Sequence, residues 1–149
     1  MGAIGGLGAT LLMTAVMLGA RRLGLTARLP PGKIAERVIE TSTDRPLSEV
    51  DERVVASALH VGFGTMAGVP FGTLMSVLGR LPAPVLAAAG AVYASGIWLV
   101  SYQGWVPGLH IMPPASRDDR GRVATMIVAH WVYGITLGLA TSRLWRLFS

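Results

Sequence analysis

A long run of residues without formal charge, from Val54 to Gly79, limits the folds that this chain can adopt. The run lies between Arg53 and Arg80, and its 26 residues include no Asp, Glu, Lys or Arg. As a helix rising about 1.5 Å per residue, it is long enough to cross the roughly 30 Å hydrocarbon layer of a membrane. We therefore expect this run to be a membrane span.

Three further apolar runs have the same character, so the expected spans are residues 3–20, 54–79, 83–102 and 123–142. Only 14% of the 149 residues are charged, whereas a soluble domain carries about 25%. The pattern predicts an all-α fold in a single transmembrane domain, residues 1–149, formed by an integral membrane bundle of four transmembrane helices. The chain has no cysteine, which excludes thiolate metal sites and iron–sulfur clusters.

The first loop, residues 21–53, contains a short amphipathic pattern that begins at Pro30 and Pro31. The residues on its two expected faces are Ile34, Ala35, Val38 and Ile39 on the apolar face and Lys33, Glu36, Arg37 and Glu40 on the charged face. This spacing predicts a short amphipathic helix. Two placements are open: the helix lies on the membrane surface, or it packs on its own loop.

One pattern occurs twice, 70 positions apart. The two copies are His60, Gly64, Gly68 and Gly72 in the second span and His130, Gly134, Gly138 and Ser142 in the fourth. This internal repeat predicts two tandem two-helix repeats, in which the second and fourth spans run parallel. The two histidines should then lie at nearly equal depth, because His60 follows Arg53 by seven residues and His130 follows Arg122 by eight.

Small residues at every fourth position of a membrane helix let another helix approach closely, as in a glycine zipper. The glycines expected to pack in this way are Gly64, Gly68, Gly72, Gly134 and Gly138. A histidine begins each stripe, so we expect the two imidazoles to face other helices, since a polar ring facing lipid is costly.

Several of these residues resemble a known family. The histidine followed by an aromatic and a small residue in two spans, the Met112-Pro113-Pro114 segment and the basic end at residues 142–146 look like the YagU-like inner-membrane proteins of bacteria. That family has no assigned biochemical activity. The resemblance implies a small multi-pass protein of the bacterial inner membrane, and it supplies no catalytic residues.

The sequence contains no catalytic motif, and Ser95, Ser101 and Thr136 lie in apolar spans without a paired base. We therefore expect no enzymatic activity. The expected role is a structural or accessory subunit that packs through its glycine-rich faces against another membrane protein or a second copy of itself. Its surroundings would be the lipid bilayer, with no nucleic acid. In this role each histidine would donate a ring N–H to a carbonyl or hydroxyl group of a neighbouring helix.

Two alternative functions use the histidines. His60 and His130 could bind a haem iron as a cofactor-binding pair, or they could hold Zn²⁺ as a metal site together with His110. Alternatively, the same two histidines could titrate near neutral pH and act as a pH sensor. Apart from these arrangements, we expect no cofactor.

The segment between the third and fourth spans has no regular pattern. Glycines and prolines interrupt residues 103–116, so we expect irregular backbone at the membrane interface, where water satisfies the polar groups. Asp118 and Asp119 follow among arginines, and we expect these two carboxylates to form a solvated hinge.

The basic residues predict how the chain is oriented in the membrane. The loops at residues 21–53 and 117–122 carry ten Lys and Arg residues, seven and three, whereas the opposite side has only Arg80, Arg143 and Arg146. Basic loops are retained in the cytoplasm. We therefore expect both of these loops in the cytoplasm and both termini outside it.

Overall fold

The computed structural model describes residues 1–26, 29–42 and 48–147, and within these ranges the chain is helical and has no β-strand. The main helices are α1 (Gly2–Arg22), α2 (Pro30–Ser42), α3 (Glu49–Leu78), α4 (Ala83–Trp98) and α6 (Arg120–Leu147). Three short elements connect α4 to α6: the π-helix η1 (Leu99–Trp105), the single turn α5 (Val106–Gly108) and the 3-10 turn η2 (Ala115–Arg117). The predicted all-α fold is confirmed.

Four helical segments are long and apolar enough to cross a membrane: Gly2–Arg22, Val50–Leu78, Ala83–Gly108 and Arg120–Leu147. The third segment is longer than the sequence indicated. Helical structure continues past Tyr102, through η1 and α5, to Gly108. The expectation of irregular backbone from Gln103 onward is therefore wrong for the first residues of that segment, because η1 retains backbone hydrogen bonding there.

Local residues explain where the helices begin and end. The Ser48 hydroxyl accepts a hydrogen bond from the backbone N–H of Asp51 at 3.2 Å and so caps the start of α3. Gly79 ends α3 with φ +83°, a conformation that favours glycine. Pro82 directly precedes α4, where its missing N–H costs no helical hydrogen bond.

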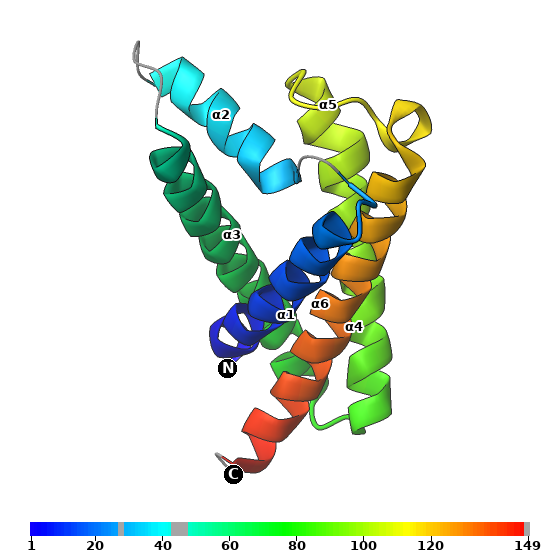
Figure 1. Cartoon of the computed structure of the whole chain (residues 1–149). Helices are drawn as coiled ribbons and strands as arrows, with labels where there is room; N and C mark the ends of the chain where they lie inside the picture. The colour runs from blue at the N-terminus through cyan, green and yellow to red at the C-terminus, as the bar shows by residue number, and fades with distance from the viewer. Residues whose placement is uncertain (27–28, 43–47, 148–149) are drawn as a thin grey trace.

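The helices form an open bundle (Figure 1). Helix α1 packs against α3 and α6, and α4 packs against α6. Helix α3 diverges from α4 and α6 toward the end of the bundle at which α2 lies across the gap (Figure 1). Both chain termini lie toward the opposite end (Figure 1).

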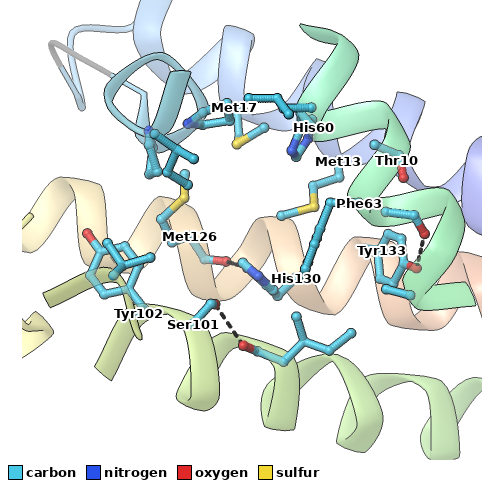
Figure 2. A pocket seen from close by; sticks show the side chains of 18 of the residues that line it. Thr10, Met13, Met17, His60, Phe63, Ser101, Tyr102, Met126, His130 and Tyr133 are labelled. Atoms are coloured by element: carbon cyan, nitrogen blue, oxygen red, sulfur yellow. Dashed lines mark hydrogen bonds between the residues drawn. The ribbon is translucent and has the colours of Figure 1, made fainter. Parts of the chain in front are cut away.

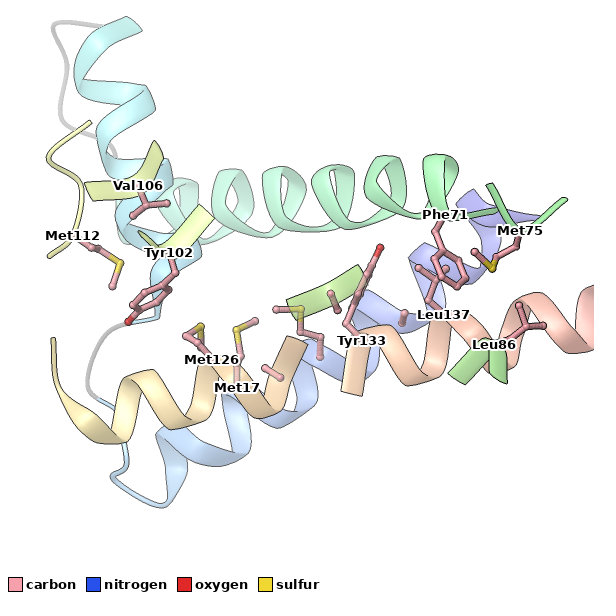
Figure 3. Packing of buried hydrophobic residues seen from close by; sticks show 14 residues of the cluster. Met17, Phe71, Met75, Leu86, Tyr102, Val106, Met112, Met126, Tyr133 and Leu137 are labelled. Carbon is pink, nitrogen blue, oxygen red and sulfur yellow. The ribbon is translucent and has the colours of Figure 1, made fainter. Parts of the chain in front are cut away.

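The core is a line of apolar side chains between the helices, and it includes the deeply buried Met17, Phe71, Leu86 and Leu137 (Figure 3). Large apolar side chains also cover the outside of the bundle, and Val92 on α4 keeps 74% of its surface exposed. An apolar exterior of this kind suits helices surrounded by lipid.

Candidate functional site

Two close helix crossings determine where the histidine-bearing helices lie. Helix α3 crosses α1 at Gly64, Gly68 and Gly72, and α6 crosses α4 at Gly134 and Gly138. A Cβ atom at Gly68 would collide with the backbone of Gly2, and a Cβ atom at Gly134 would collide with the backbone of Gly90. The structure therefore places all five glycines at contacts within the chain, where a larger residue would force the helices apart.

His60 on α3 and His130 on α6 line the same cavity, which has a volume of about 330 Å³ (Figure 2). This volume is at the lower end of the roughly 300–1,000 Å³ typical of ligand pockets. The other side chains of the cavity wall come from every long helix and from η1, and they include Met13, Met17, Ile34, Phe63, Ile97, Ser101, Tyr102, Trp105, Met126 and Tyr133. None of the described lining residues is Asp, Glu, Lys or Arg.

The two imidazoles differ in their hydrogen bonds. The Nδ1 atom of His130 lies 2.7 Å from the carbonyl oxygen of Met126, one turn earlier in α6 (Figure 2). A carbonyl can only accept, so Nδ1 donates and carries the proton of the neutral ring, which leaves Nε2 as an acceptor. The Nε2 atom of His60 is buried and has no hydrogen-bond partner among the residues that the structure describes. The expectation that each ring donates to a neighbouring helix is therefore wrong for Nδ1 of His130, because the nearest carbonyl is in its own helix.

The π-helix η1 forms one wall of the cavity and contributes Ser101, Tyr102 and Trp105. The ring of Tyr102 is buried, and it stacks on Trp98 with the ring centroids 5.9 Å apart. π-Helices are rare and occur frequently at functional sites. Here the π-helix contributes three residues to the wall of the cavity that the two histidines also line.

A buried ion pair holds η1 against the start of α6. The Tyr102 hydroxyl donates to the Asp118 carboxylate at 2.5 Å, and Nη1 of Arg122 donates to the same carboxylate at 2.5 Å. The Asp118 side chain is only 3% exposed. The prediction of a solvated hinge is therefore wrong for Asp118, because the carboxylate turns inward to two donors. Asp119 is exposed and accepts from the backbone N–H of Arg122 at 2.9 Å.

Helix α2 covers one end of the cavity with Pro30, Pro31, Ile34 and Val38. Its residue Ala35 is fully buried, and the helix packs against α3. The structure thus places the apolar face of the predicted amphipathic helix on the bundle, at one end of the cavity.

Two tyrosines tie α3 to the other half of the bundle. The Tyr133 hydroxyl on α6 donates to the carbonyl of Gly64 at 2.6 Å, and the Tyr93 hydroxyl on α4 donates to the carbonyl of Ala67 at 2.6 Å. The Tyr93 ring also contacts Phe71, with centroids 5.4 Å apart. These contacts close the bundle on the side of the cavity opposite α2.

A second pocket, of about 400 Å³, lies next to the cavity, between α3 and α4 on the outer face of the bundle. The residues common to both pockets are Phe63, Ile97, Ser101 and Trp105. Phe63 is 54% exposed, and in a membrane this face would meet lipid. The cavity therefore shares part of its wall with a face of the bundle that lipid would cover.

His110 does not join the other two histidines. It is exposed, with φ +57°, in the turn after α5, and it does not line the cavity. In the part of the chain that the structure describes, no group of three or more His, Cys, Asp or Glu side chains could hold a metal ion. The three-imidazole Zn²⁺ site proposed from the sequence is therefore not assembled.

Sequence reasoning identified the two histidines but missed most of the cavity wall. Met13, Met17 and Met126 gave no distinct signal, because methionines in apolar spans are ordinary core residues. A usable signal was the uncharged segment after Tyr102, where Trp105 follows at a three-residue spacing that suits one helix face.

Comparison with known proteins identifies one family. Residues 1–146 match the model of DUF6789, a family of unknown function. No curated protein and no solved structure matches the chain.

Proposed function

The chain belongs to the DUF6789 family, and because no function is known for that family, we propose one from the cavity. The protein binds the apolar chain of a membrane-soluble molecule between its helices and does not transform it. The observation that carries this proposal is the largely apolar cavity beside His60 and His130, which shares part of its wall with an outer pocket between α3 and α4.

The chemistry of the wall favours binding over catalysis. Ser101 is a hydroxyl side chain in the wall, and it donates to the carbonyl of Ile97 at 2.7 Å, so its proton is directed to a backbone acceptor and not to a base. Nucleophilic catalysis needs a base within hydrogen-bond reach of the nucleophile. A small apolar pocket with a few polar atoms is instead the usual form of a ligand site.

Filling the cavity tests this function. In the variant Ser101→Trp, the indole would occupy space that a bound chain needs. We expect tritiated hexadecanol to bind the purified wild-type protein in lipid nanodiscs and to bind Ser101→Trp at least about tenfold more weakly, a loss of about 1.4 kcal/mol. The measurement is a saturation binding curve for each variant.

The matched control is Val92→Trp, which adds the same side chain on the lipid-facing side of α4, outside the cavity wall. It should bind as the wild type does. Equal binding by all three proteins would mean that the probe adheres to the outer surface, and the proposed function would be wrong.

An accessory role in a larger membrane complex is the second candidate. It is supported by Gly8, Gly62 and Gly96, around which the structure shows open space, so that a helix of a partner or of a second copy could approach there. Co-purification of another membrane protein at a fixed ratio in mild detergent would support this role. A single species of the mass of one chain would contradict it.

The alternatives that use the histidines remain predictions. Haem ligation would need Nε2 of both His60 and His130, and a haem absorption band that the His130→Leu change removes would reveal it. A pH-sensing role predicts a pH-dependent response that disappears when both residues are replaced by Gln.

We also propose that the chain arose by duplication and that it lies in a bacterial inner membrane. The first proposal is supported by the two similar crossings, since Gly64 faces Thr10 in one and Gly134 faces Ala94 in the other. The second is supported by the resemblance to YagU-like proteins and by the apolar helices. The distribution of Lys and Arg favours both termini outside the cytoplasm.

A further inference from the structure

We propose that the molecule bound in this cavity is an uncharged chain that carries a hydroxyl group, and that His60 and His130 recognise this hydroxyl. The inference rests on the proposed function and narrows it to one ligand chemistry. It is carried by two properties of the cavity: the absence of charged side chains from its described wall and the hydrogen-bonding state of the two imidazoles.

The wall disfavours a charged ligand. A carboxylate or phosphate would leave water without meeting a Lys or Arg side chain, because none lies among the described lining residues. An unpaired ion in an apolar site costs far more free energy than a neutral polar group. Ordinary phospholipid headgroups and ionised fatty acids therefore do not suit this site.

The imidazoles call for a group that can donate a hydrogen bond. Nε2 of the neutral His130 ring is an acceptor, since Nδ1 carries the proton and donates a hydrogen bond to the carbonyl of Met126. A ketone, ester or ether oxygen can only accept, and such an oxygen beside Nε2 would face another lone pair. A hydroxyl group donates to Nε2 and keeps its own acceptor sites.

His60 adds a second requirement. Its Nε2 atom is buried without a partner, and a buried polar atom left unpaired costs about 1–3 kcal/mol. A hydroxyl can satisfy this nitrogen in either tautomer of the ring, since it donates as well as accepts. The hydroxyl is thus the simplest neutral group compatible with both rings.

The shape of the site indicates how such a molecule lies. Phe63, Ile97 and Trp105 line both the cavity and the outer pocket, so the chain would pass between α3 and α4 into the lipid. The hydroxyl would lie inside, beside the histidines and below Ile34 of α2. Fatty alcohols, polyprenols, sterols and diacylglycerols share this chemistry.

The decisive experiment compares three probes of equal chain length on the wild-type protein in nanodiscs: hexadecanol, its methyl ether and hexadecanoate. The probes share the same hydrocarbon chain and differ in the group at its end. We expect hexadecanol to bind at least about fivefold more tightly than either of the others, as the loss of one or two hydrogen bonds predicts. This comparison needs no variant, so impaired folding cannot confuse it.

Variants of the histidines then test which side chains recognise the hydroxyl group. His130→Leu should lower the affinity for hexadecanol to that for the methyl ether and leave the affinity for the methyl ether unchanged. His60→Leu should lower the affinity for hexadecanol by a smaller factor. His110→Leu is the matched control, because His110 lies outside the cavity, and it should bind all three probes as the wild type does.

The outcomes separate this inference from the proposed function. Equal binding of hexadecanol and its ether would overturn the hydroxyl inference and leave the proposed apolar site intact, provided that Ser101→Trp still binds hexadecanol at least about tenfold more weakly than the wild type. Tighter binding of hexadecanoate would overturn the argument from charge. If none of the probes binds, the proposed function itself is wrong.

Discussion

Polar atoms are costly inside a bilayer unless they find partners, and single residues of this bundle show how that cost is met. The hydroxyl of Thr10 donates to the carbonyl of Gly6 at 2.7 Å, and Thr141 donates to Leu137 at 2.9 Å. The buried Nε2 of His60 has no such partner. A polar atom left unsatisfied at a cavity wall is a place where a ligand can add the missing hydrogen bond.

The charge of the Asp118 carboxylate supports the shape of the cavity wall, since this group holds Tyr102 of η1 and Arg122 of α6 together. We predict that Asp118→Asn lowers the free energy of unfolding by about 3 kcal/mol, at the lower end of the range for a broken buried pair, because Arg122 keeps 15% exposure. Reversible unfolding in mixed micelles measures this loss.

The matched control removes a carboxylate from the surface instead. Glu40 pairs with Arg37 on α2 at 3.4 Å, with their side chains 58% and 50% exposed. Exposed pairs contribute at most about 1 kcal/mol, so Glu40→Gln should unfold almost as the wild type does. If the two substitutions cost the same, the pair at Asp118 has no special structural role.

At the scale of elements, the crossing of α4 and α6 depends on backbone contact. We predict that Gly134→Ala destabilises the bundle by about 1–3 kcal/mol, as overpacking does, because the added methyl group would collide with the backbone of Gly90. Unfolding in mixed micelles again provides the measurement.

Gly62 is the matched control for this change, since the space around it is open. Gly62→Ala should be neutral, or stabilising by up to about 1 kcal/mol through helix propensity. A loss of stability at Gly62 as large as that at Gly134 would show that these glycines are needed for flexibility and not for close packing.

The sequence predicted which segments are helical far better than how these helices pack against one another. An uncharged run as long as Val54 to Gly79 favours a membrane-spanning helix, and the two histidine patterns pointed to two side chains that line one cavity. The π-helix at residues 99–105 could not be predicted, because its extra residue per turn has no local sequence signature. The bond from Tyr102 to Asp118 likewise depends on how α6 packs.

For the whole molecule, the distribution of basic residues predicts orientation in the membrane. The chain has no native cysteine, so single cysteines can report which side each segment faces. We predict that a membrane-impermeant maleimide added to intact cells labels Arg80→Cys, between α3 and α4, and does not label Lys33→Cys, on α2. The reverse labelling would place both termini in the cytoplasm.

The whole molecule also limits what could be inferred about function. The first expectation was that glycine-rich faces bind a partner, yet the structure places Gly64, Gly68, Gly72, Gly134 and Gly138 at contacts within the chain. In the described part of the chain, the cavity forms only when the five long helices, η1 and α5 come together, and its wall combines residues from Thr10 to Tyr133. Apart from the uncharged segment after Tyr102, no local pattern in the sequence indicates this cavity.

The most direct test of the central claim maps where a chain binds in the membrane. A fatty alcohol with a diazirine at the middle of its chain is incorporated with the wild-type protein into a bilayer, illuminated, and located by peptide mass spectrometry. We predict adducts at buried wall residues such as Met17, Tyr102 and Met126, and competition by excess unlabelled hexadecanol. Adducts confined to lipid-facing residues such as Val77 and Val92, without competition, would contradict a ligand site inside the bundle.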